Sequence, residues 1–177
     1  MSEFRVTLRP ALAAQQPIIT GGVSLRALPE GHVIHVLGKP CGAAIDATLA
    51  LLGDGSPGAV RAAGPGQWFI VGNTAKNHAE LAALLDALQP SAFGVDQSHG
   101  RVRMLVNGSM VERVLAKGTA VDLSLAVFPV GRATTTLIGH IAAHITRVDD
   151  DAFEIMVLRS FAASLWDDLA RMCAGFA

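Results

Sequence analysis

Two β-branched runs separated by a glycine turn constrain the fold of this chain most. Residues 134–138 and 141–148 are rich in Thr, Ile and Val, and Gly139 lies between them. This pattern predicts a β-hairpin. The acidic stretch Asp149–Asp151 predicts a further turn, and apolar residues alternate in the run that follows, residues 153–158. The last third of the chain is therefore expected to contain successive strands.

Further strands are expected earlier in the chain. Residues 53–66 are dense in Gly and Pro and are expected to form a loop. Short apolar, β-branched or alternating runs predict strands at residues 23–28, 32–37, 67–71, 92–96 and 101–106.

Helical patterns lie between and after these strands. Apolar residues recur at helical spacing within residues 41–52, which predicts a helix there. Asn77 with Glu80 resembles a capping box, and a stripe of leucines follows it until Pro90. Two more helices are predicted from side chains that would cap them, namely Ser109 with Glu112, and Ser160.

This mixture of elements indicates an α+β fold, with a mixed, mainly antiparallel sheet that helices cover. Residues 1–30 are broken by Pro and Gly and are interpreted as an extended N-terminal arm, which would wrap its own domain or lie on a partner. Residues 31–177 are predicted to form a single α+β domain, because no linker divides them.

Charged side chains are scarce in this sequence. They make up 16% of the 177 residues, whereas a soluble domain has about 25%. Obligate subunits bury apolar surface against partners, so the shortage favours such a subunit. An alanine-rich composition or an unusually large core would also give a low share of charged residues. The net charge of −1 argues against a nucleic-acid partner, because no excess of basic side chains would attract phosphates.

The sequence also indicates where in the cell the protein is expected. The first ten residues include Glu3 and lack an apolar segment, so no signal peptide is expected. No run reaches the roughly 18 uncharged apolar residues of a membrane span. Cys41 and Cys173 lie far apart and are expected to be free thiols in a reducing compartment. A soluble, cytoplasmic protein without a membrane partner is predicted.

Three candidate binding motifs do not fit their sequence context. Gly53–Gly58 reads GDGSPG and matches a dinucleotide-binding pattern, but a predicted helix precedes it where that pattern needs a strand. His140 and His144 would lie about 13 Å apart on a strand, which is too far for one metal ion. His32 and His35 fall on opposite faces of a strand.

Three other candidates have simpler interpretations. Asp96, Ser98 and His99 are triad residue types, but they are adjacent and fit a turn better. Asp149–Asp151 lacks the alternating ligands of a calcium loop. Arg132 could meet an anion or a partner carboxylate, although a surface arginine is the simpler interpretation. The sequence therefore predicts no catalytic, cofactor-binding or metal-binding residue in this chain.

Four longer segments occur in a specific order. They are GPGQWFIVG (64–72), DQSHGRVRMLVNG (96–108), VLAKGTAVDLSLAVFPVG (114–131) and DDDAFEIMVLRSFAASLWDDL (149–169). In this order, and above all in the last two segments, the sequence resembles the gamma subunit of heterotetrameric sarcosine oxidases.

That resemblance implies a fold similar to the folate-binding domain of glycine-cleavage aminomethyltransferases. It implies a four-chain flavoenzyme that oxidises sarcosine to glycine, with hydrogen peroxide and formaldehyde or 5,10-methylenetetrahydrofolate as the other products. The FAD, FMN, NAD and tetrahydrofolate sites would belong to the larger chains and zinc to the delta chain. The partners would be the alpha, beta and delta subunits, with self-association when the chain is isolated.

The resemblance also implies which residues build the fold and the subunit contacts in a non-catalytic gamma chain. An alternative is an independent folate-binding domain that transfers one-carbon units, and another is a stand-alone homo-oligomer. The residues that fit the family motifs are Trp68, Arg101, Asp122, Phe128, Pro129, Gly131, Arg132, Arg159, Phe161 and Trp166.

Overall fold

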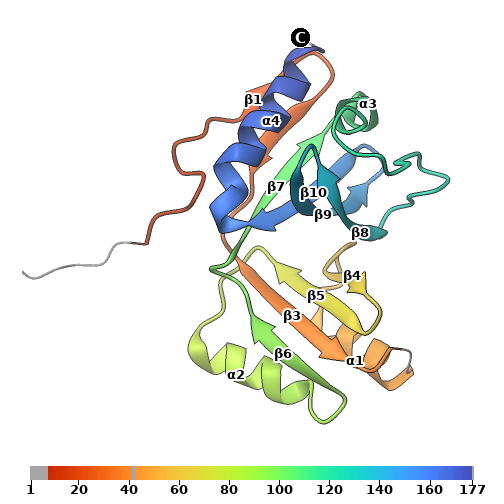
Figure 1. Ribbon diagram of the computed structural model, residues 1–177. Helices are drawn as coiled ribbons and strands as arrows, with labels where there is room; N and C mark the ends of the chain where they lie inside the picture. The colour runs from red at the N-terminus through yellow and green to blue at the C-terminus, as the bar shows by residue number, and fades with distance from the viewer. Residues whose placement is uncertain (1–7, 41–42, 177) are drawn as a thin grey trace, which may run out of the picture.

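The computed structural model describes residues 8–40 and 43–176, which form two antiparallel sheets and their helices (Figure 1). Sheet A has the strand order β1-β2-β7-β10-β9-β8, and sheet B has the order β4-β5-β3-β6. The predicted α+β class is confirmed, but the strands divide between two sheets where one was expected. Cys41 and the start of the predicted arm lie outside the described residues.

Sheet A contains the predicted hairpin. Gly139 has φ of +61° in its turn, a backbone conformation that residues with a Cβ adopt at a cost. Apolar side chains alternate along the central strands and line one face of the sheet. The strands are β1 (Ile18–Ile19), β2 (Ser24–Ala27), β7 (Arg101–Asn107), β8 (Ala133–Ile138), β9 (Ile141–Asp149) and β10 (Ala152–Leu158).

Two helices cover that apolar face of sheet A. They are α3 (Val111–Leu115) and α4 (Ala162–Ala174), the second of which follows the 3-10 turn η1 (Arg159–Phe161). Figure 1 shows α4 lying along the sheet. Its apolar side forms a common core with the alternating strand residues. Cys173 is a free thiol and is buried in this core.

Sheet B packs its own two helices on one face. Its strands are β3 (His32–Gly38), β4 (Val60–Gly64), β5 (Gln67–Gly72) and β6 (Ala92–Asp96). The helices are α1 (Ala43–Leu52) and α2 (His78–Ala87). The predicted capping box of α2 is confirmed, because the Asn77 side chain accepts from the Glu80 amide and the Glu80 carboxylate accepts from the Asn77 amide.

The predicted loop over residues 53–66 is wrong in its second half. Residues 60–64 form β4, which makes a hairpin with β5. The sequence did not predict this strand, because its side chains are small and Gly and Pro residues lie nearby. It forms by pairing with β5, whose own sequence favours a strand. The turn needs glycine: Gly66 has φ of +68°, and a Cβ there would lie 2.4 Å from the Gly38 carbonyl oxygen.

Two predicted helix caps are also wrong. The N-cap residue of α3 is Met110, without a side-chain cap, and Glu112 forms an ion pair with Arg147 instead of closing a box on Ser109. Ser160 lies inside η1, and Phe161 holds the N-cap position of α4. In both cases tertiary contacts fix where the helix begins, and a capping pattern reports only local preference.

The second face of sheet A packs on sheet B. Val33, Phe69 and Val71 of sheet B meet Met156 of sheet A in a small apolar cluster. All four strands of sheet B lie in sequence between β2 and β7, which pair with each other in sheet A. Residues 18–27 of the predicted arm thus complete sheet A at its edge. Among the described residues, no helix is long and apolar enough to cross a membrane.

Candidate functional site

The segment between α3 and β8, residues 119–132, is here called the motif loop, because it holds half of the residues predicted from the family pattern. It extends away from sheet A, and Figure 1 draws it in teal at the right. Leu125, Val127 and Val130 are 46%, 45% and 39% exposed on it. Leu123 and Phe128 turn inward, and the Phe128 ring lies 6.1 Å from the ring of Phe153. The loop therefore presents apolar side chains to the exterior.

Arg147 on β9 anchors the base of this loop from inside the protein. Its side chain is fully buried, and its guanidinium donates to the carbonyl oxygens of Leu123 and Asp150. It also forms a 2.6 Å ion pair with Glu112 and lies 4.4 Å from the centre of the Phe153 ring. One guanidinium thus ties the start of the motif loop to α3 and to the turn after β9.

Backbone and local contacts fix the other end of the motif loop. The Gly131 amide donates to the Arg147 carbonyl oxygen at 2.9 Å, and the Arg147 amide donates to that of Arg132 at 3.0 Å. The Arg132 guanidinium donates to the Val127 carbonyl oxygen at 2.7 Å and lies 5.8 Å from the Phe128 ring centre. Arg132 is exposed, as the simpler interpretation of a surface arginine predicts, and its guanidinium is held by its own loop.

Two further motif residues form turns in the same loop. Asp122 accepts from the Ser124 amide at 2.9 Å, and its pKa is lowered by the backbone and side-chain hydrogen bonds of Ser124. Pro129 is exposed, and its carbonyl oxygen accepts from the Arg132 amide at 3.0 Å. Gly131 has φ of +86°, which favours glycine.

The other predicted residues lie elsewhere. Arg159 and Phe161 lie in η1, directly before α4: Arg159 pairs with Glu30 at 2.8 Å, and Phe161 is exposed. Trp166 is buried in the core of sheet A, and Trp68 packs half-buried against the helices of sheet B. The structure therefore places five of the ten predicted residues in the motif loop, and the other five lie elsewhere in the fold. The five in the motif loop are Asp122, Phe128, Pro129, Gly131 and Arg132.

Arg101 begins β7 and lies between the sheets. Its guanidinium is 5.0 Å from the ring centre of Phe69, and its Nε donates to the Gln97 side chain at 2.8 Å. Partial burial lowers the pKa of Arg101. The side chain therefore contributes to the contact between the two sheets.

The predicted turn Asp96–His99 is confirmed. The Ser98 amide and hydroxyl both donate to Asp96 Oδ1, at 2.9 and 2.5 Å. The Ser98 hydroxyl also accepts from the Val33 amide at 3.1 Å. His99 is exposed, so these residue types build a turn and are not arranged as a nucleophile with its base.

The two histidines of the hairpin have different surroundings. His140 is exposed in the turn, whereas His144 is only 1% exposed and lies 5.2 Å from the Phe69 ring. His144 Nδ1 is 3.0 Å from the Thr135 hydroxyl, and its Nε2 has no partner within the described part of the chain. Burial, with the nearby charges of Arg61 and Arg101, lowers the pKa of His144 to about 4.

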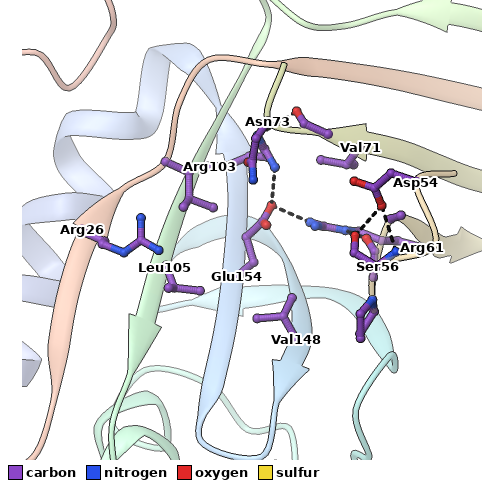
Figure 2. A pocket seen from close by; sticks show the side chains of 15 residues that line it. Arg26, Asp54, Ser56, Arg61, Val71, Asn73, Arg103, Leu105, Val148 and Glu154 are labelled. Carbon is purple, nitrogen blue, oxygen red and sulfur yellow. Dashed lines mark hydrogen bonds and ion pairs between the residues drawn. The ribbon is translucent and has the colours of Figure 1, made fainter. Parts of the chain in front are cut away.

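Three buried charged side chains form an ion-pair cluster between the sheets: Arg61 of β4, Arg103 of β7 and Glu154 of β10 (Figure 2). Glu154 Oε1 lies 2.7 Å from Arg61 Nη1 and 3.5 Å from Arg103 Nη1. Arg103 Nη2 donates to the Gly72 carbonyl oxygen and the Asn73 side chain, at 2.9 and 2.8 Å. Burial lowers the pKa of Arg103, and Glu154 opposes that shift.

Sequence reasoning missed this cluster and the anchor Arg147. A signal was present: Arg103 and Glu154 alternate with apolar neighbours on β7 and β10, so their places on one face were predictable. Alternation marks that face as polar and does not reveal that a second sheet covers it. Arg147 carried no such signal, because it lies in a strand that is buried on both faces.

Residues 32–174 match the model of the family described as "Sarcosine oxidase, gamma subunit family". The chain belongs to that family. A comparison with curated proteins found no match.

Solved structures agree with the family in fold. A chain of the heterotetrameric sarcosine oxidase from Corynebacterium sp. U-96, in complex with pyrrole 2-carboxylate, is 24% identical to this gamma subunit family member. Its TM-score is 0.80, and the match covers 96% of both chains. At this identity the likeness shows the fold alone.

The predicted resemblance to an aminomethyltransferase fold is confirmed. Glycine cleavage system aminomethyltransferase T from Bartonella henselae is 18% identical, with a TM-score of 0.57 over 84% of this chain. The match covers 45% of that protein, so the gamma subunit family member corresponds to less than half of its length.

Proposed function

We propose that this chain is the gamma subunit of a heterotetrameric sarcosine-oxidase-type complex in the cytoplasm, and that it contributes contacts between subunits and no catalytic group. The observation that carries the proposal is the family match over residues 32–174. The fold shared with a chain of a heterotetrameric sarcosine oxidase supports it. The partners are the alpha, beta and delta subunits, which hold the FAD, FMN, NAD, zinc and tetrahydrofolate sites.

The motif loop is the proposed contact with a larger subunit. Leu125, Val127 and Val130 expose apolar surface that water solvates poorly, and burial against another chain would remove it from water. The anchor Arg147 and the buried Phe128 hold the loop in one conformation before any partner binds. A loop that is already ordered loses little conformational entropy on binding, which favours affinity.

A second apolar set on sheet B is the proposed contact with another subunit. Phe93 of β6 is 65% exposed and pairs across the strands with Leu37 of β3, while Val95 is exposed two residues further along β6. Strand β6 is an edge of sheet B, so its outer side has no partner strand among the described residues. Apolar side chains and an open strand edge together suit a protein partner.

Co-expression with the alpha, beta and delta chains tests the function. We expect the complex to co-purify with this chain and to lose stability or turnover of sarcosine without it. A complex that assembles and turns over sarcosine fully in its absence would refute the proposal.

The motif-loop contact is tested by the double variant Leu125→Asp/Val127→Asp. Two buried carboxylates at an apolar interface should reduce the amount of this chain in the purified complex at least tenfold. Leu51→Asp is the matched control, because Leu51 is 86% exposed on α1, far from the motif loop in sequence. Unchanged urea midpoints for the isolated variants exclude misfolding. Full retention of the double variant would rule out the motif loop as a contact.

The independent folate-binding domain stays an alternative. Titration of the isolated chain with tetrahydrofolate tests it, since saturable binding would favour that activity over a role in assembly. Sedimentation of the same sample tests whether the isolated chain associates with itself.

A further inference from the structure

A pocket of about 300 Å³ opens between the two sheets beside the ion-pair cluster (Figure 2). Strands β2, β7, β9 and β10 of sheet A and strands β4 and β5 of sheet B contribute to its walls. Residues 54–59, which follow α1, close one side. No residue of the motif loop lines it, so it is separate from the proposed subunit contact.

Positive charge exceeds negative charge around this pocket. Its lining includes the three arginines Arg26, Arg61 and Arg103 but only two carboxylates, Asp54 and Glu154. The two buried arginines share one oxygen of Glu154. Leaving a charge unpaired in a poorly solvated place costs free energy, and a bound anion would remove that cost.

Asp54 does not neutralise the arginines directly. Its Oδ1 accepts from the amide and the hydroxyl of Ser56, at 2.9 and 2.5 Å. These hydrogen bonds lower the pKa of Asp54, so its charge stays at the pocket rim over the neutral pH range. The formal charge of the lining is therefore +1, which matches a monoanion better than phosphate or a dicarboxylate.

Two guanidinium groups have donors left for a ligand. Arg26 is exposed on β2 and lines the pocket, and it has no hydrogen-bond or ion-pair partner among residues 8–40 and 43–176. The Nε and Nη1 atoms of Arg61 are occupied by the Gly58 carbonyl oxygen and Glu154, whereas its Nη2 has no partner in the same described ranges. Guanidinium groups bind carboxylates through paired N–H donors.

The uncharged part of the lining is mostly apolar, with Ser56 and Asn73 as its polar side chains. Leu28, Val71, Leu105 and Val148 contribute to the walls, next to the small residues Gly58, Ala59 and Gly72. We propose that this pocket binds a small monocarboxylate with a short apolar tail. The carboxylate would pair with Arg26 and Arg61, and the tail would lie against the leucine and valine side chains.

Titration of the isolated full chain with sodium butyrate tests this proposal. Acetate, succinate and inorganic phosphate serve as comparison anions at constant ionic strength, and arginine Nε–H signals and the Gly58 and Asn73 amides are followed by NMR. Saturable shifts with butyrate are expected, with weaker binding of acetate, which lacks the tail. Succinate and phosphate should bind no more tightly than butyrate.

Substitutions of the rim arginine sharpen the test. Arg26→Gln should weaken butyrate binding about tenfold, and Arg26→Lys should weaken it less because it keeps the charge. Arg171→Gln is the control: it makes the same charge change on α4, which covers the opposite face of sheet A.

Several results would overturn the proposal. These are no saturable shift with butyrate, equal binding by wild type and Arg26→Gln, and tighter binding of phosphate than of butyrate. Loss of butyrate binding in the assembled complex, with the arginine signals already shifted, would assign the pocket to a carboxylate of a partner subunit instead. Because the first measurements use the isolated chain, they are independent of the proposed role in the complex.

Discussion

The two sheets differ in how many apolar side chains their helices bury against them. Helix α4 buries Leu165, Trp166 and Leu169 against sheet A, within a core that also includes strand residues from β2, β7, β9 and β10. Within α2 on sheet B, Leu84 is the buried residue, and the core beneath α1 and α2 is smaller. The stability of sheet B therefore depends more on the contacts at its other face, where the ion-pair cluster and Phe69 meet sheet A.

Two helices on a sheet do not by themselves determine how large the apolar core beneath them is. Buried apolar area provides most of the stability, and a helix contributes according to the side chains it buries. In this chain the contact between the sheets compensates for the weaker core, and it does so partly with charged groups.

The largest expected loss of stability follows a substitution in the core of sheet A. Trp166→Ala should lower the free energy of unfolding by about 3–5 kcal/mol, because it leaves a large cavity in the core of sheet A. Leu84→Ala should cost about 2 kcal/mol, since its site lies at the edge of a smaller core that can collapse around it. Urea denaturation followed by circular dichroism measures both, and equal losses would contradict the difference between the sheets.

An effect at the lower end of the range for Trp166→Ala is expected from the ion-pair cluster. Glu154→Gln keeps the shape of the side chain but leaves Arg61 and Arg103 buried without a carboxylate, which should cost about 3 kcal/mol. Hydrogen exchange should rise more in β4 and β5 than in α4, because the contact between the sheets is weakened.

Asp168→Asn is the control for that substitution. It breaks the Arg171–Asp168 ion pair, whose arginine is largely exposed, and should cost only about 0.5 kcal/mol. Similar losses for Asp168→Asn and Glu154→Gln would show that burial of the cluster is unimportant for stability.

An effect smaller than that of Glu154→Gln, and dependent on pH, is expected from His144. The pKa of His144 is lowered to about 4 in the folded protein, from 6.5, so the unfolded chain binds a proton more readily between these values. Stability from this group is complete above pH 6.5 and falls as the pH drops toward 4, by about 2 kcal/mol between pH 7 and 5. Urea midpoints of wild type and His144→Gln at both pH values measure it, and parallel pH profiles would contradict it.

Local sequence patterns predicted much of the secondary structure. The hairpin around Gly139 and the capping box at Asn77 depend on neighbours within a few residues, and both were found. Strand β4 was missed because its pairing comes from β5 and its own residues have weak strand propensity. Ser109 and Ser160 matched a capping pattern, but contacts from distant residues set the helix starts.

The candidate sites were predicted less completely. The family pattern pointed to the motif loop through Asp122, Phe128 and Gly131, which the structure places in one segment. It did not point to Arg147, which holds that segment from another strand. The ion-pair cluster was beyond local reasoning, because Arg61 and Glu154 are 93 residues apart and meet only when two sheets pack together.

The nesting of sheet B between β2 and β7 has a consequence for biosynthesis. The side chains of Ser24 and Asn107 are hydrogen-bonded although they are 83 residues apart in the chain. At roughly 5–20 residues per second, a ribosome needs about 4–17 s to add the strand that completes this pairing. Residues 32–96, which include all of sheet B, are synthesised during that interval. Sheet B can therefore form first, while β2 does not yet have its partner strand β7.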